Sequence, residues 1–92
     1  MNCHLDYNTV ADKLVDLYAV PFGGKASGRY RIAAKLLRQL FDCRRLYEDD
    51  VRMLTRALAQ RGHVLVDMDA FFVVMAANTF VNYRRANEDS VS

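Results

Sequence analysis

The chain has 92 residues, a formal net charge of +2 and a hydrophobic content of 52%. This length predicts one domain over residues 1–86 with a polar tail over 87–92, and the apolar content excludes a disordered chain. No run approaches the roughly 18 apolar residues of a membrane span, and no basic-then-apolar leader opens the chain. Cys3 and Cys43 are far apart and lack metal spacing, which favours reduced thiols in a cytoplasmic protein.

The first predicted element is a helix that Asp6 or Asn8 caps and that runs to about Val20. Its apolar face recurs at helical spacing and comprises Val10, Leu14, Leu17 and Tyr18. Pro21 and the Gly23-Gly24 pair cannot continue a helix without loss, so we expect a connection over residues 21–26.

A second helix is expected from about Gly28 to Phe41, with Ser27 as its N-cap. Its broad apolar stripe consists of Ile32, Ala33, Leu36, Leu37, Leu40 and Phe41. A short turn over residues 42–45 then leads into the next helix, which predicts two neighbouring helices.

The third predicted helix, Tyr47–Arg61, has the clearest signals in the chain. Acidic residues occupy its first turn, where they face the positive end of the helix dipole: Glu48, Asp49 and Asp50. Val51, Leu54 and Leu58 form an apolar stripe, and Gly62 follows where a left-handed residue ends many helices.

Two apolar runs after Gly62, residues 63–67 and 70–75, predict a β-hairpin whose first strand begins at His63. Alternation along each run predicts Val64, Val66, Phe72 and Val74 on one face of the hairpin. It predicts Leu65, Phe71 and Val73 on the other face. Both faces are apolar, so further elements or a partner must cover one of them.

The segment after the hairpin permits two interpretations. Asn78 or Thr79 can cap a short last helix that turns Phe80 and Tyr83 inward. The alternative is a third strand over Thr79–Tyr83. In either case the sequence predicts a small α+β domain with three helices, a hairpin and a short C-terminal element.

Positive charge is concentrated in the second quarter of the chain, because residues 25–45 hold seven basic and one acidic side chain. Basic residues around Tyr30, expected to be an exposed aromatic at a helix start, are typical of phosphate or nucleic-acid contact. The competing interpretation is an ordinary solvated helix face. The candidate nucleic-acid-binding residues are Lys25, Arg29, Tyr30, Arg31, Lys35, Arg38, Arg44, Arg45, Arg52 and Arg56.

Nothing in the sequence indicates catalysis, a metal or a cofactor. His4 and His63 have no second ligand at helical or strand spacing. Asp67 and Asp69 lie in an expected turn, where exposure to solvent makes a catalytic role improbable. We therefore expect a protein that is not an enzyme.

The order helix, helix, turn, helix, hairpin over residues 8–75 resembles the winged helix-turn-helix superfamily. The resemblance implies a three-helix core with the hairpin as wing and 47–61 as recognition helix, and its DNA-facing residues would be Arg52, Thr55, Arg56 and Gln60. The chain departs from that pattern in the carboxylates at the start of this helix and at Asp67 and Asp69, which repel phosphate.

Two functional hypotheses follow. The first is a dimeric regulator of transcription that binds DNA through the basic segment 25–45. The second is a protein-binding adaptor or inhibitor that uses its acidic positions and the surplus apolar side chains of the hairpin. Its partner or dimer surface would include Phe71, Val73 and Met75.

Overall fold

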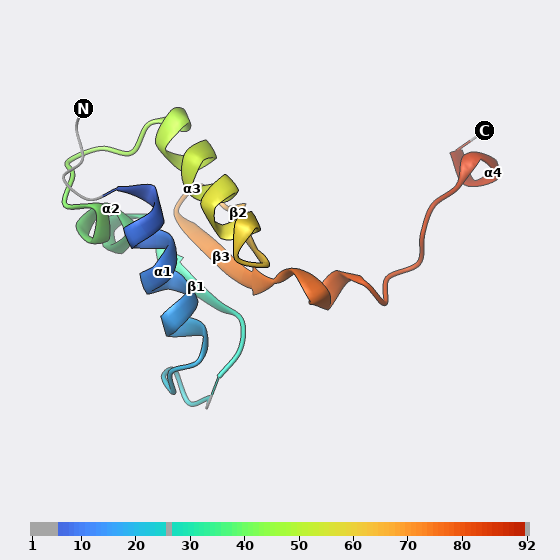
Figure 1. Ribbon diagram of the computed structural model, residues 1–92, viewed down its shortest axis with the longest axis horizontal. Helices are drawn as coiled ribbons and strands as arrows, with labels where there is room; N and C mark the ends of the chain where they lie inside the picture. Colours follow the sequence, from blue (N-terminus) through green and yellow to red (C-terminus); the bar gives the residue numbers. More distant parts are fainter. Residues whose placement is uncertain (1–5, 26, 92) are drawn as a thin grey trace.

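A three-stranded antiparallel sheet and four α-helices make up the part of the chain that the computed structural model describes, residues 6–25 and 27–91 (Figure 1). In chain order the elements are α1 (Tyr7–Tyr18), β1 (Tyr30–Ala33), α2 (Ala34–Phe41), α3 (Glu48–Gln60), β2 (His63–Asp67), β3 (Phe71–Ala76), the 3-10 helix η1 (Ala77–Phe80) and α4 (Glu88–Val91). The expected α+β class is confirmed.

Helix α1 begins where the first of the two candidate caps predicts. The carboxylate of Asp6 accepts a hydrogen bond of 2.7 Å from the backbone N–H of Thr9, and this bond lowers the pKa of Asp6. The helix ends at Tyr18, two residues short of the predicted end. Val10 and Leu14 are fully buried, as the helical spacing predicts.

The predicted helix start at Gly28 is wrong. Tyr30–Ala33 forms strand β1, and α2 begins only at Ala34. Tyr30 and Ile32 point into the core while Arg31 and Ala33 are exposed, which is the two-residue period of a strand. The backbone of this segment pairs with β3, so its hydrogen bonds are satisfied across the sheet and Ser27 caps no helix.

Helix α3 confirms the third prediction. One of its three acidic residues, Asp50, is buried: its carboxylate accepts bonds of 2.9 Å from the Tyr47 N–H and 3.2 Å from the Tyr7 hydroxyl. The second bond joins α1 to the start of α3. Gly62 follows the helix with a φ of 75°, the left-handed conformation that glycine adopts without strain.

Strand β3 lies in the middle of the sheet, which has the order β1-β3-β2. The hairpin turn is closed by a bond of 2.8 Å from the Asp69 N–H to the Asp67 carboxylate, and Asp69 has a φ of 71°. The resulting register sets Leu65 opposite Val74.

The predicted faces of the hairpin are therefore wrong, because directly opposed residues of antiparallel strands share one face. Leu65 lies with Phe72 and Val74, not with Phe71 and Val73. The other face, which we call the outer sheet face, carries five larger apolar side chains together with Ala33 and Arg31. The five are Val64, Val66, Phe71, Val73 and Met75.

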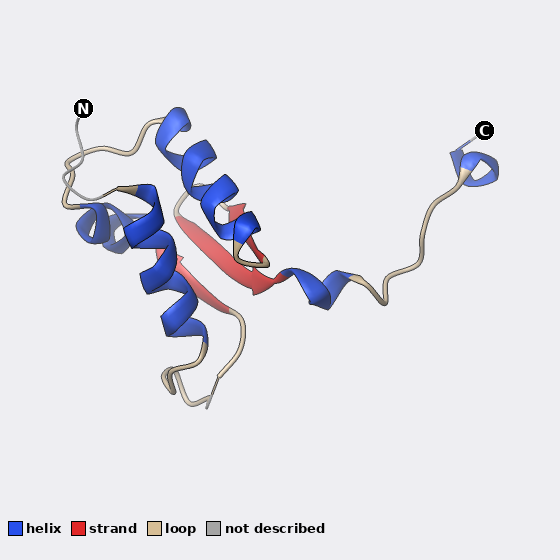
Figure 2. Ribbon diagram, in the orientation of Figure 1, coloured by secondary structure: helices blue, strands red, loops and turns tan. Residues whose placement is uncertain are grey.

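The hydrophobic core lies between the helices and one face of the sheet, and α1 and α3 lie in front of the sheet in the view of Figure 2. Its largest fully buried side chains are Phe41, Leu14, Leu37, Leu54, Leu58, Val10 and Val74. Helix α1 contacts both α2 and α3, and α2 and α3 contact the strands of the sheet. Each helix thus buries one stripe, and the sheet buries one of its two apolar faces.

Residues 77–91 form an arm that leads away from this body (Figure 1). The predicted short helix capped by Asn78 or Thr79 is wrong, because the segment forms only the 3-10 turn η1, which begins at Ala77 without a side-chain cap and ends at Phe80. Thr79–Tyr83 is not a strand either. Tyr83 does not face inward: it is 61% exposed, and its ring rests on Phe80 at 5.3 Å. Glu88–Val91 adds one exposed helical turn in the segment where we expected only a frayed tail.

Candidate nucleic-acid interface

The connection between α1 and β1 builds a hollow, which we call the basic hollow. Phe22 and Lys25 bond each other's backbones at 3.0 Å in both directions, with Gly23 and Gly24 at positive φ between them. The Gly28 N–H donates to the carbonyl of Tyr18 at 2.9 Å and ties the loop to the end of α1. The described lining residues are Val20, Phe22, Gly23, Lys25, Ser27, Gly28, Arg29, Tyr30 and Arg31.

Every charged side chain that lines the basic hollow in the described chain is positive. Lys25 and Arg29 are exposed and make no ion pair with any described residue. Arg31 lies over the Phe71 ring, with its guanidinium carbon 5.5 Å from the ring centroid. Three cations without a lining carboxylate give this end of the molecule a positive potential.

Tyr30 is not the exposed aromatic that the sequence predicts. It is 9% exposed, and its hydroxyl donates to the Leu14 carbonyl at 2.6 Å. Burial raises the pKa of this phenol. Phe22 instead presents an aromatic ring to solvent, 43% exposed and edge-on to Tyr30 at 5.4 Å. The Pro-Phe-Gly-Gly sequence indicates this exposure of Phe22, because it predicts a loop and loops lie at the surface.

The expected phosphate-binding helix end at Ser27 and Gly28 is wrong as well, because β1 and not a helix follows them. The N–H groups of an N-terminal helical turn are therefore not available in the basic hollow. Any anion bound there depends on side-chain cations and on loop N–H groups.

A second hollow lies beyond the other end of β1, where the hairpin tip approaches the start of α3. We call it the mixed hollow, since the charged residues that line it carry both signs: Arg38, Arg44, Arg45, Arg52, Glu48, Asp67 and Asp69. Arg45 lies over the Tyr47 ring at 5.6 Å, and Arg52 pairs with Asp49. The carboxylates offset the arginines, so this hollow lacks the uniform sign of the basic hollow.

The structure therefore divides the basic segment 25–45 into two groups separated by β1. The two hollows share no lining residue. Lys35 is exposed near the start of α2 and lines neither of them.

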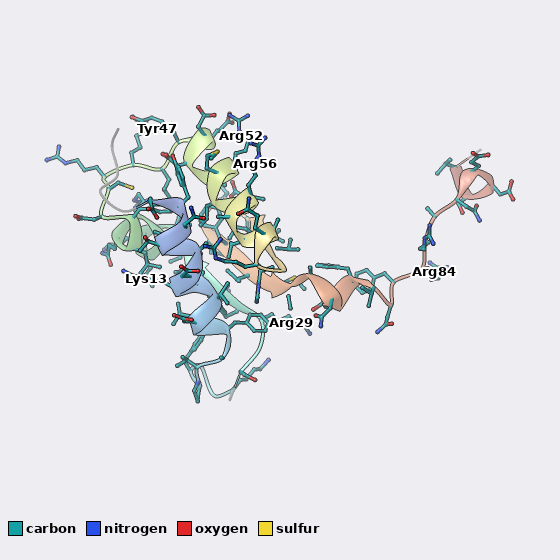
Figure 3. The ribbon with its side chains drawn as sticks, viewed as in Figure 1. Lys13, Arg29, Tyr47, Arg52, Arg56 and Arg84 are labelled. Atoms are coloured by element: carbon teal, nitrogen blue, oxygen red, sulfur yellow. The ribbon has the colours of Figure 1, made fainter. Side chains whose placement is uncertain are left out.

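The outer side of α3 carries the remaining candidates. Arg52 and Arg56 extend from its exposed surface into solvent (Figure 3). Gln60 is exposed too. Thr55 is half-buried and donates its hydroxyl to the Val51 carbonyl at 2.8 Å, which occupies that donor within the helix.

The predicted partner residues Phe71, Val73 and Met75 lie together on the outer sheet face and are half-buried. His63 begins β2 as expected, with its ring 5.1 Å from that of Tyr18. Across the described residues no His, Cys, Asp or Glu side chains gather in a group that could hold a metal ion. Within the same residues no helix is long and apolar enough to cross a membrane. Cys43 is a half-buried free thiol, and Cys3 lies outside the described residues.

In the comparisons with known proteins, no family model, no curated protein and no solved structure matches the chain. The function must therefore be argued from the geometry of the chain itself.

Proposed function

We propose that the protein is a non-enzymatic cytoplasmic regulator that binds nucleic acid, most simply DNA, and that the basic hollow makes the main backbone contacts. The observation that carries this proposal is the charge of that hollow: Lys25, Arg29 and Arg31 are its charged lining residues in the described chain. Phosphate neutralisation by such side chains supplies most of the sequence-independent affinity for DNA.

The exposed Phe22 ring adds a second kind of contact. A ring at the edge of a cationic hollow can stack on an unpaired base while the cations hold the adjacent phosphates. This arrangement favours single-stranded or locally opened nucleic acid, because bases inside a duplex offer no free face.

The winged-helix-like layout belongs to the same proposal. Its support is the order of α1, α2 and α3 followed by the β2–β3 hairpin. In that layout α3 would be the recognition helix and would present Arg52 and Arg56 to a groove. The acidic residues Glu48 and Asp49 in its exposed first turn weigh against close approach of phosphates there. We therefore assign the main contacts to the basic hollow.

The test compares two double variants that each remove two positive charges. Lys25→Ala with Arg29→Ala changes the basic hollow, and Arg44→Ala with Arg45→Ala is the matched control at the mixed hollow. Fluorescence anisotropy with labelled duplex and single-stranded oligonucleotides would measure both against the unchanged protein over a range of salt concentrations.

We expect the first variant to lose about tenfold or more in affinity, and its salt slope to fall by about 2. The control should keep its affinity within about threefold. If the control variant instead lost more affinity than the first variant, binding would be assigned to the mixed hollow at the start of α3, as the winged-helix layout implies. Absence of binding to either oligonucleotide at low salt would overturn the proposal altogether.

A protein-binding role is the second candidate, and a different observation favours it. The outer sheet face is apolar, and none of the described helices packs on it. Large uncovered apolar surfaces usually mark a site of association.

A further inference from the structure

Two parts of this chain expose apolar side chains in the described structure, and the first is the outer sheet face. Its five larger apolar side chains are only half-buried, because the strands shield one another but no helix lies over them. The core packs against the opposite face, on Ile32, Phe72 and Val74. A sheet face of this composition normally packs against another layer.

The second part is the C-terminal arm, residues 77–91. Val81, Tyr83 and Val91 are 75%, 61% and 79% exposed. Neither η1 nor α4 makes more than marginal contact with the other described elements. The arm also expands the chain: the radius of gyration is 14.9 Å, whereas a compact domain of this length has about 12 Å.

A backbone hydrogen bond at the first residue of the arm fixes the direction in which the arm leaves the sheet. The Ala77 N–H donates to the Gly62 carbonyl at 2.8 Å, which fixes the chain at the end of the β2–β3 ladder. The rings of Phe80 and Tyr83 then meet edge to face, and the chain continues away from the sheet (Figure 1). Covering its own outer sheet face would require the chain to reverse at η1, so the arm is placed to meet another molecule.

We propose that the partner is a second copy of this chain, and that two copies exchange their arms so that each arm covers the outer sheet face of the other. Every chain carries both halves of this contact, so a two-fold axis satisfies both at once and doubles the buried area. The exchange uses a different surface from the proposed nucleic-acid site, although Arg31 belongs to both.

Reach and charge both agree with this exchange. Fifteen extended residues span up to about 50 Å, and a six-residue strand is about 20 Å long. Arg31 is the charged residue of the outer sheet face, in a row with Val73 and Val66. The arm carries Arg84 and Arg85 before Glu88 and Asp89, so its charges balance, and in the exchange Glu88 supplies a carboxylate for that guanidinium.

Sedimentation equilibrium of the full chain tests the proposal first. We expect a dimer at micromolar concentration, and we expect Val81→Asp with Tyr83→Asp to weaken it by about 30-fold or more, because two charges would enter an apolar contact. The matched control is Leu36→Asp with Met53→Asp, which changes two residues of similar character on the helices, 52% and 40% exposed. Circular dichroism of each variant would show that the fold persists.

Cross-linking then identifies which surfaces meet. Both native cysteines are first replaced by Cys3→Ser and Cys43→Ser. One preparation then carries Val81→Cys on the arm and another carries Val66→Cys on the outer sheet face. Mixing and mild oxidation should give a disulfide-linked pair that joins one chain of each kind, and each preparation alone should give far less.

Three results would overturn the exchange. The chain could remain monomeric at 100-fold higher concentration than the micromolar range in which we expect the dimer. The helix control could dissociate the dimer as strongly as the arm variant. A chain that carries both new cysteines could form its disulfide mainly within itself, which would show that the arm folds back on its own sheet.

Discussion

The two faces of β3 use similar side chains for different purposes. Phe72 and Val74 point toward the helices and are 4% and 0% exposed, whereas Phe71 and Val73 alternate with them on the outer sheet face and are half-buried. Apolar area removed from water stabilises the folded state in proportion to its extent. The inner row therefore contributes more to the stability of the single chain than the outer row does.

The same difference holds along β1. Tyr30 and Ile32 fill the core, while Arg31 lies on the outer sheet face and lines the basic hollow. A short strand thus joins the interior to both proposed binding surfaces. Substitutions at neighbouring positions of these strands should separate folding from binding.

The largest expected difference lies between two adjacent phenylalanines. Phe72→Ala should lower the free energy of unfolding by about 3–5 kcal/mol, because it empties space within the core. Phe71→Ala should lower it by less, about 1–2 kcal/mol, since part of its side chain already touches solvent. Urea titration measures both, at a protein concentration below the dissociation constant of the dimer. Equal losses would mean that the outer sheet face is covered within the single chain.

Alkaline pH should reveal the buried phenol of Tyr30. Burial raises its pKa in the folded state, whereas the unfolded chain ionises it near about 10. The folded state then binds the proton more tightly, so stability is intact below about pH 10 and falls above it. The slope approaches about 1.4 kcal/mol per pH unit at most. Tyr30→Phe should reduce this slope, and an unchanged slope in this variant would show that other groups carry it.

The two neighbours Tyr30 and Arg31 should also differ at neutral pH. Tyr30→Phe removes the hydroxyl that donates to the Leu14 carbonyl and should cost about 1 kcal/mol. Arg31→Ala removes an exposed side chain and should change stability by no more than about 0.5 kcal/mol. Thermal and chemical unfolding give both values. A larger loss for Arg31→Ala would show that its contact with Phe71 supports the sheet.

Local signals predicted the parts of the fold that agree with local preference. Helix α3 has acidic residues in its first turn and Gly62 after its end, and both ends match the structure to about one residue. The hairpin strands were predicted from β-branched and aromatic runs. Their register was not, because it depends on the left-handed turn at Asp69, and a shift of one position exchanges the faces.

Strand β1 could not be predicted from local signals. Its four residues continue directly into α2, and Ile32 and Ala33 also fit the apolar stripe of a longer helix. Only pairing with β3, about forty residues later, decides in favour of the strand. The geometry of the candidate site also depends on whether residues 30–33 form a strand or a helix. The cations were identified from the sequence, but the strand buries Tyr30 and separates Arg29 from Arg38.

The smallest expected effect concerns the one described ion pair that joins α1 to the end of α3. The Arg61 guanidinium lies 2.7 Å from the Asp12 carboxylate, but the two side chains are 25% and 66% exposed, so solvent screens their attraction. Asp12→Asn should cost about 0.5 kcal/mol or less, and the loss should fade at high salt. Asp16→Asn on the same helix is the control, because Asp16 makes no ion pair with the described residues. A loss of several kcal/mol would show that charge, and not apolar packing, holds the helices over the inner face.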